Sequence, residues 1–153
     1  MIEIYERLGM HVHAQVDEVI TLSHEQRVKG RLKVFSESGL ELGLFLERGK
    51  PLLVGEFLKS TSGKIIQVKG QVENVAHASC DDWNNFSRAC YHLGNRHVKL
   101  QVGERWLRFS PDHVLEEMVH LLGLVVTHEE AVFEPESGAY AKGTHAGHGH
   151  KHD

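Results

Sequence analysis

Residues 80–102, CDDWNNFSRACYHLGNRHVKLQV, contain a helical pattern that gives way to an extended one. Either Asp81 or Asp82 is suited to cap the helix, and apolar residues then recur at helical spacing. The pair Gly94-Asn95 is typical of a helix end. The segment HVKLQV that follows is typical of a strand. The stretch therefore predicts a helix followed by a strand, with His97 at the first strand position.

The flanking sequence extends this pattern in both directions. VENVAHAS (72–79) predicts a strand, and RWLRFS (105–110) pairs with 97–103 as a hairpin around Gly103. PDHVLEEMVHLLG (111–123) predicts a second helix, with Pro111 in its first turn and Gly123 at its end. Its expected apolar stripe is Val114, Leu115, Met118, Leu121 and Leu122. With LVVTHEEAVF (124–133) as a last strand, residues 72–135 predict a ferredoxin-like βαββαβ domain.

Residues 1–71 predict a small all-β domain, so the fold class is α+β. RVKGRLKV (27–34) alternates between cationic and apolar residues, and LELGLFL (40–46) places four leucines on one face. With the turn SESG between them, these segments predict a hairpin. VDEVITLS (16–23), GEFLKS (55–60) and KIIQVKGQV (64–72) predict further short strands, with STSG as another turn. We detect no internal repeat. Residues 136–153 are rich in Gly, Ala and His without periodicity, which predicts a disordered His-rich tail.

The composition argues against several classes of protein. The 153 residues carry a formal net charge of -4 and no basic aromatic stripe, so no nucleic-acid partner is expected. No apolar run approaches the roughly 20 residues of a membrane span, and no signal peptide is expected. Only two cysteines, Cys80 and Cys90, occur, so no disulfide framework is expected. A cytoplasmic location is the simplest interpretation.

Motifs of catalysis are missing or incomplete. SHEQRV (23–28) begins like the helix motif of zinc proteases, but position 28 is valine where the second histidine would stand. No nucleophile elbow, phosphate-binding loop or dinucleotide fingerprint is present. The adjacent carboxylates of CDDW and LEEM are explained by helix capping and solvation. We therefore expect no enzymatic activity.

Histidine is the compositional outlier, with 13 residues in 153. Four lie in the last nine residues: His145, His148, His150 and His152. They are spaced by other residues, whereas a purification tag is normally an uninterrupted run. Imidazole binds divalent first-row metals, so this segment predicts metal binding, for which Ni²⁺, Cu²⁺ and Zn²⁺ are all suitable. Because ordering a flexible tail costs conformational entropy, this binding should be loose.

Three further residues are candidate metal ligands. A lone histidine on a strand is usually structural, but His97 directly follows a helix end, and a symmetric dimer would supply a second His97 across its axis. His113 starts the second helix, where it could act as an auxiliary ligand. Cys80 lies at a strand-to-helix corner and could be either a core residue or a ligand. Glu116, Glu117 and His120 are better explained as an ordinary polar helix face.

Several blocks of the chain resemble one known family. CYHLGNRHVKLQV is the most distinctive of them, and SHEQRVKGRLKV, GLELGLFLERG, PDHVLEEMVHLLGL and FEPESGAY occur in the expected order. Over nearly its whole length the chain resembles the UreE family of urease accessory proteins, the nickel metallochaperones.

This resemblance implies a peptide-binding-like N-terminal domain and a second domain that binds metal and forms a homodimer. It implies that His97 is the central nickel ligand, one from each chain, and that the tail histidines bind additional nickel. His113 matches an accessory metal position whose usual partner is here Pro111. Cys80 falls where some members carry a cysteine near the interface.

The resemblance further implies that the dimer delivers Ni²⁺ to the urease maturation complex, with the urease accessory GTPase as direct recipient. An alternative function from another class is a peptide-binding or co-chaperone module that carries an incidental metal-binding tail. Persistence of peptide binding in the presence of a chelator would favour that alternative.

Overall fold

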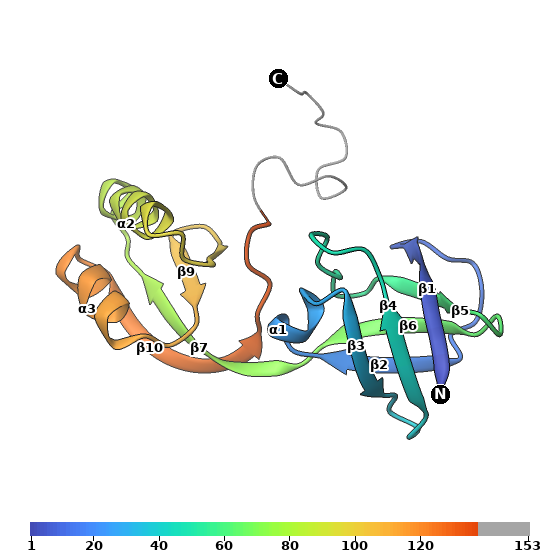
Figure 1. Ribbon diagram of the computed structural model, residues 1–153. Helices are drawn as coiled ribbons and strands as arrows, with labels where there is room; N and C mark the ends of the chain where they lie inside the picture. Colours follow the sequence, from blue (N-terminus) through green and yellow to red (C-terminus); the bar gives the residue numbers. More distant parts are fainter. Residues whose placement is uncertain (138–153) are drawn as a thin grey trace. The chain divides into compact units, whose positions relative to one another are not determined.

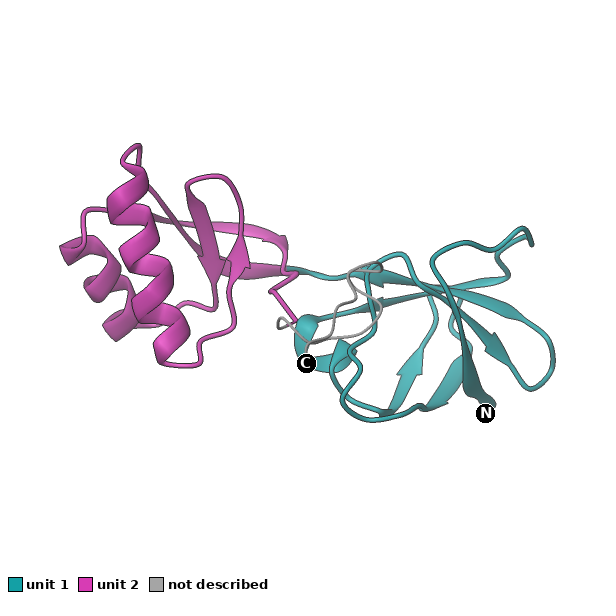
Figure 2. Cartoon of the chain, turned by 90° about the horizontal axis from the view of Figure 1, so that it is seen from above, with its two compact units in different colours: residues 1–72 teal, residues 73–153 magenta. Residues whose placement is uncertain are grey.

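The computed structural model describes residues 1–137 and has an α+β fold, as predicted. The chain divides into two compact units, Met1–Val72 and Glu73–Asp153, which Figure 2 shows in different colours. Among the described residues, no helix is long and apolar enough to cross a membrane.

Unit 1 is a six-stranded sheet with one short helix (Figure 1). Its elements are β1 (Ile2–Gly9), β2 (Glu18–Leu22), α1 (His24–Arg27), β3 (Arg31–Phe35), β4 (Glu41–Phe45), β5 (Phe57–Ser60) and β6 (Ile65–Gly70). The strand order is β2-β6-β5-β1-β4-β3. The antiparallel pairs β3/β4 and β5/β6 are hairpins, whereas β1 pairs with β4 and β2 with β6 in parallel. The predicted hairpin around SESG is confirmed.

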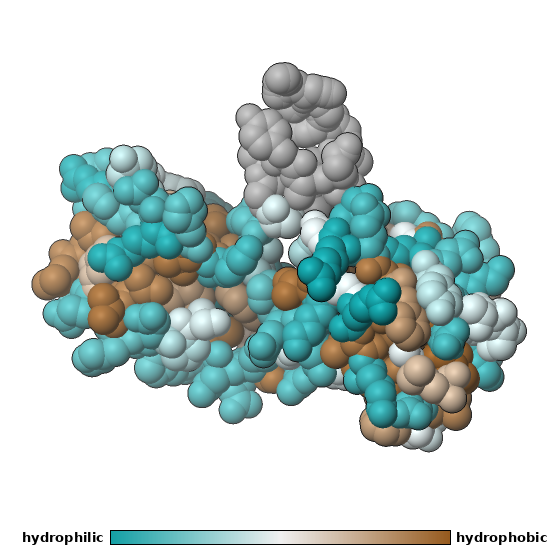
Figure 3. All heavy atoms as spheres, viewed as in Figure 1, coloured by the Kyte–Doolittle hydropathy of each residue, from teal (hydrophilic) through white to brown (hydrophobic). Residues whose placement is uncertain are grey.

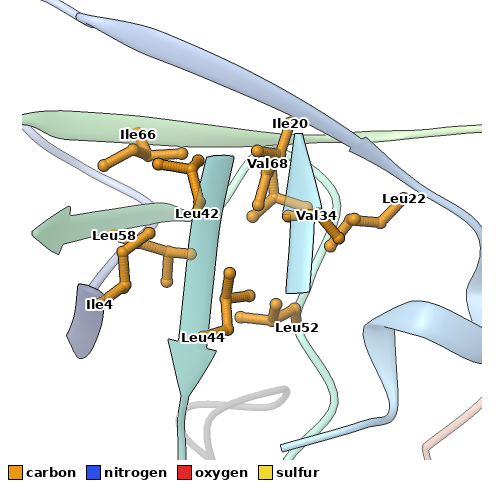
Figure 4. Packing of buried hydrophobic residues seen from close by; sticks show 10 residues of the cluster. All are labelled: Ile4, Ile20, Leu22, Val34, Leu42, Leu44, Leu52, Leu58, Ile66 and Val68. Carbon is orange, nitrogen blue, oxygen red and sulfur yellow. The ribbon is translucent and has the colours of Figure 1, made fainter. Parts of the chain in front are cut away.

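The core of unit 1 comes from inward-facing residues of all six strands. Figure 4 shows aliphatic side chains from different strands pointing toward one another. Ile4, Ile20, Leu42, Leu44, Leu58, Ile66 and Val68 are fully buried, while Leu22, Val34 and Leu52 are nearly so. Because the core leucines and isoleucines alternate with outward residues, the period of two seen in the sequence sets which face is buried.

The prediction of one continuous strand over 27–34 is wrong. Ser23 caps α1, and the reciprocal bonds between Ser23 and Gln26 form a capping box. Arg27 is buried and donates a hydrogen bond of 2.8 Å from its guanidinium to the carbonyl of Leu22. This local capping outweighs the alternation of charged and apolar residues, so β3 begins only at Arg31.

The structure shows a repeat that the sequence analysis did not detect. The loops 36–40 and 60–64 both read Ser-x-Ser-Gly-x, and their glycines have φ values of 94° and 91°. In each loop the first serine hydroxyl accepts a bond from the backbone N–H four residues on, at 3.1 Å and 2.9 Å. Each is a three-residue hairpin loop whose glycine adopts the left-handed conformation.

The repeat extends beyond the loops to whole strands. The pairing register repeats after 24 residues. Val34 lies opposite Leu42 in the β3/β4 hairpin, and Leu58 lies opposite Ile66 in the β5/β6 hairpin. A parallel strand is then added to each hairpin in the same register, since Ile4 lies opposite Leu44 and Ile20 opposite Val68. Unit 1 is therefore built from two equivalent three-stranded halves.

Ser36 and Ser60 should contribute equally to stability, because their environments are equivalent and both are 5% exposed. We expect Ser36→Ala and Ser60→Ala each to lower the free energy of unfolding by about 1 kcal/mol, since each removes the acceptor of a backbone N–H. Urea unfolding of both variants and of the double variant measures this, with the exposed Ser110→Ala as control. Markedly unequal losses would contradict the equivalence of the two halves.

Unit 2 places two helices on one side of a four-stranded sheet (Figure 1). Its elements are β7 (Val72–Ser79), α2 (Trp83–Asn95), β8 (Gln101–Val102), β9 (Trp106–Phe109), α3 (His113–Leu121) and β10 (Val125–Val132), in the sheet order β10-β7-β9-β8. Ala76, Leu107 and Phe109 of the sheet pack with Leu93 and Val119 of the helices in one core. The order of the elements along the chain is β-α-β-β-α-β.

The two helices run antiparallel. A Cβ atom added to Gly123, just after α3, would lie 2.9 Å from the Nδ2 atom of Asn85 in the first turn of α2. The beginning of α2 is therefore next to the end of α3. The end of α2 and the start of α3 consequently share the opposite end of the helix pair.

Two details of unit 2 differ from the sequence prediction. The strand predicted from His97 onward covers only Gln101–Val102, because the residues after α2 form a turn. α3 is capped by Asp112 and starts at His113, so Pro111 lies outside it. The buried side of α3 carries Val119, while Val114 and Leu121 are 61% and 75% exposed.

Candidate metal site

His97 lies in the turn that ends α2, not at the edge of a strand as predicted. The N–H of His97 donates to the carbonyl of Gly94 at 2.9 Å, and the N–H of Val98 donates to the carbonyl of Leu93 at 3.2 Å. This pair of bonds is the Schellman motif. Leu93 and Val98 also pack in the same hydrophobic cluster, which is the apolar contact that accompanies this motif.

His97 occupies the left-handed position of this motif, with a φ of 60°. Glycine is the usual residue there, because a Cβ atom makes the left-handed conformation costly by roughly 1–2 kcal/mol. α3 ends in the same motif with Gly123, φ 100°, whose N–H donates to His120 while Leu124 donates to Val119. Two equivalent turns in one unit therefore differ in having histidine or glycine at the strained position.

The strained conformation presents the imidazole to solvent at the end of α2. His97 is exposed, as are Gly94, Asn95 and Arg96 before it. The C-terminal end of a helix carries partial negative charge, which stabilises a nearby cation. Strained non-glycine residues tend to mark functional positions. The local geometry thus suits His97 to bind a metal ion from outside the chain.

His113 is the first residue of α3 and is exposed. Because the helices are antiparallel, it lies at the same end of the helix pair as His97. The structure thus places this predicted auxiliary ligand on the same side of unit 2 as the central candidate.

Cys80 lies at the other end of α2 from His97. The 13 residues of the helix separate them, which is about 20 Å along its axis. The backbone N–H of Cys80 donates to Arg105 at 3.3 Å, and its thiol donates to the carbonyl of Asp82 at 3.3 Å. Cys80 and His97 of one chain therefore cannot bind the same ion.

Within residues 1–137, no three side chains of His, Cys, Asp or Glu are gathered as a metal site. His97, His113 and Cys80 are accordingly not brought together into one closed site. The other predicted ligands, His145, His148, His150 and His152, lie outside the described residues.

The structure reveals one contact between a histidine and a glutamate that the sequence analysis missed. His128 of β10 lies 2.8 Å from Oε1 of Glu116 in α3, and Oε2 of Glu116 accepts the N–H of Asp112 at 3.0 Å. Glu116 therefore does more than cover a solvated face, because it connects the start of α3 to the last strand. The two residues are 12 apart in sequence, so no periodicity could have indicated the pair.

Cys90, predicted to belong to the core, packs against the hydrophobic cluster of unit 2. Burial raises the pKa of the Cys90 thiol. Since the thiolate is the form that binds metal, burial disfavours Cys90 as a ligand.

Two protein-family models match this chain, one in each of its two units. The model for the UreE N-terminal domain matches residues 4–70, and that for the UreE C-terminal domain matches residues 73–153. The chain belongs to the UreE family of urease accessory proteins. The resemblance inferred from the sequence blocks is thereby confirmed.

Curated members of the UreE family match this chain over nearly its whole length. A urease accessory protein UreE from Marinomonas sp. is 67% identical over 152 residues, covering 99% of both chains. The UreE proteins of Alteromonas mediterranea and Psychromonas ingrahamii are 57% and 52% identical, covering 98% and 100% of this chain and 95% and 99% of their own lengths. These proteins are named as accessory proteins of urease, and their names state no enzymatic activity.

Proposed function

We propose that this UreE family member is a nickel metallochaperone that delivers Ni²⁺ for assembly of the urease active site. Two protomers hold the ion between their His97 side chains. The tail histidines His145, His148, His150 and His152 collect further ions or complete the coordination, and His113 is an auxiliary ligand. The recipient is the urease maturation complex in the cytoplasm, through its accessory GTPase.

The observation that carries this proposal is the left-handed backbone at the exposed His97. A glycine would satisfy the turn at lower cost, as Gly123 does at the end of α3. Because the turn does not need the imidazole, the exposed ring is available to a metal ion, and imidazole is a preferred ligand of nickel.

Exposed apolar side chains on unit 2 support the homodimer. Val114 and Leu121 are seven residues apart, on the same face of α3, and Tyr91 of α2 is 68% exposed. Figure 3 shows hydrophobic side chains gathered over the helices of this unit. A second copy covering this surface would bury apolar area and bring two His97 residues close to the symmetry axis.

Transfer of Ni²⁺ requires a site that can both bind the ion and release it. Two imidazoles leave coordination positions of Ni²⁺ open, so an incoming ligand of the recipient can bind before both histidines leave. Imidazole must be neutral to bind metal, so lowering the pH should favour release. Zn²⁺ and Cu²⁺ are expected to bind the same side chains.

We further propose that the second domain, residues 72–135, has the ferredoxin-like fold, preceded by a peptide-binding-like domain over 1–71 and followed by a His-rich tail over 136–153, most of which lies outside the described residues. The strand order β10-β7-β9-β8 supports the ferredoxin-like assignment, because it places the first and third strands of the unit side by side.

Calorimetric titration with Ni²⁺ tests the proposed function. We expect the wild-type chain to bind one tight ion per dimer and additional weaker ions. His97→Ala should remove the tight site, and truncation after Gly143 should remove the weaker ones. His120→Ala, at an exposed position of the same unit, is the matched control and should bind as the wild type does.

Two results would contradict the proposal. Loss of the tight site on truncation alone would make the tail the real ligand set. Retention of one tight ion per dimer in His97→Ala would exclude His97 as a ligand. Analytical ultracentrifugation of each variant separates loss of metal binding from loss of the dimer.

A further inference from the structure

The outer edge of β3 is not paired along its length by any strand in the described part of the chain. β3 is the last strand in the sheet order. Hydrogen bonds at both ends of the hairpin, from Ser36 to Leu40 and from Leu46 to Gly30, set the register with β4. In this register the backbone groups of Arg31, Lys33 and Phe35 point away from β4.

The equivalent edge in the other half of unit 1 is occupied. β5 corresponds to β3, and β1 pairs with β5 as an antiparallel strand. The N–H of Thr61 donates to Glu3 at 3.0 Å, and at the equivalent place the N–H of Glu37 donates to Val19 at 2.9 Å. β2 therefore begins to approach β3 as β1 approaches β5.

This pairing does not continue, because β2 ends early. β1 has eight residues, whereas β2 has five and is followed at Ser23 by the capped helix α1. The repeat thus shows that an antiparallel strand fits this kind of edge, as β1 does at β5. Most of β3 has no such partner strand among the described residues.

The side chains along the open edge are cationic. Arg31 and Lys33 are exposed and alternate along β3, and the exposed Lys29 precedes the strand. Arg31 lies over the ring of Phe45 at 5.5 Å, and Lys33 forms an exposed ion pair of 2.9 Å with Glu41. Cations on an edge strand prevent pairing with another copy of the same edge, and the same charges favour an acidic strand.

Aromatic side chains lie beside these cations. Phe35 is 64% exposed, and Tyr5 stacks on Phe45 with a centroid distance of 5.2 Å. Phe35, on β3 itself, offers apolar contact to a strand added at this edge, whereas Phe45 and Tyr5 lie on the inner strands β4 and β1.

We propose that the open edge of β3 binds an extended acidic peptide segment as an antiparallel strand. Backbone hydrogen bonds to Arg31, Lys33 and Phe35 hold the peptide, and the cations select acidic side chains. The interaction uses unit 1 alone and needs no metal ion. It rests on the proposed peptide-binding-like character of residues 1–71 and is independent of the proposed nickel site, so peptide binding in a chelator leaves the nickel proposal to be decided by the calorimetric titration.

The test uses a synthetic probe, an acetylated seven-residue peptide that alternates Glu and Val, added to the ¹⁵N-labelled full chain in a chelator. We expect the amide exchange of Lys33 and Phe35 to slow on binding. The amides of Leu32 and Val34 already bond to β4 and serve as internal controls, with unchanged exchange. A matched peptide alternating Lys and Val should bind at least about tenfold more weakly, and added salt should weaken binding of the acidic peptide.

The double variant Arg31→Glu/Lys33→Glu provides the reciprocal measurement. It should lose about tenfold or more in affinity for the Glu-Val peptide and gain affinity for the Lys-Val peptide. Equal binding of the two peptides to the wild-type chain would overturn the proposal. So would protection of amides elsewhere, or no spectral change at millimolar peptide.

Discussion

Replacing His97 with glycine is expected to stabilise the protein while removing its tight nickel site. Glycine adopts the left-handed conformation at φ 60° without the steric cost of a Cβ atom, although it also increases the entropy of the unfolded chain. We expect a net gain of roughly 0.5–1 kcal/mol in the free energy of unfolding. Nickel affinity should fall at least about 100-fold, since changes to outer-shell residues alone commonly cost 10–100-fold.

Thermal and urea unfolding of the metal-free chain, together with nickel titration, measure both effects. Gly123→Ala is the reciprocal control: it should destabilise, because φ is 100° and the new methyl group would lie 2.9 Å from Asn85. Gly94→Ala, within α2 and with open space around it, should instead stabilise slightly. Should His97→Gly prove less stable than the wild type, the imidazole must hold the turn through contacts of its own.

Removing the carboxylate of Glu56 is expected to cost about 3 kcal/mol of stability. Glu56 is 4% exposed and accepts bonds from Arg7 at 2.7 and 2.8 Å and from the N–H of Leu53 at 3.0 Å. Arg7 also donates to the carbonyls of Lys50 and Pro51. In Glu56→Ala the largely buried guanidinium loses its counter-charge, and the chain from 50 to 56 loses its attachment to β1.

Glu41→Ala is the matched control, because it removes an exposed partner of Lys33. We expect no measurable change in its urea midpoint, since exposed ion pairs contribute little. Glu56→Gln should fall between the two, because an amide can still accept the bond from Leu53. If Glu56→Ala unfolds at the wild-type urea concentration, Arg7 has found other partners and the buried pair is not needed for stability.

Local sequence patterns predicted much of the secondary structure correctly. The turns SESG and STSG, the strand 72–79 and the end of α3 at Gly123 are as expected, and of the two predicted cap residues, Asp81 and Asp82, it is Asp82 that caps α2. Each of these features depends on residues within a few positions of one another, so the local sequence was enough to predict it. Residues 27–30 were misassigned to a strand because 27–34 alternates between cationic and apolar residues, while the capping box of Ser23 and Gln26 was overlooked.

The candidate ligands could also be named from the sequence, but the backbone conformation at His97 could not be predicted. Gly94-Asn95 correctly indicated the end of α2, yet the left-handed residue is His97, two positions later. This position could not be predicted, because positive φ is uncommon for any non-glycine residue and the turn depends on the packing of Leu93 and Val98.

Residue patterns along the chain were enough to indicate a β-rich part followed by an α+β part, and to single out histidine as the compositional outlier. The pairing of strand edges and the contacts between distant residues became known from the three-dimensional fold. Arg7 and Glu56 are 49 residues apart, and β1 pairs with β4 although β2, α1 and β3 lie between them along the chain. Such contacts depend on how strands that are distant in sequence pack around the core. This packing produces no periodic pattern along the chain.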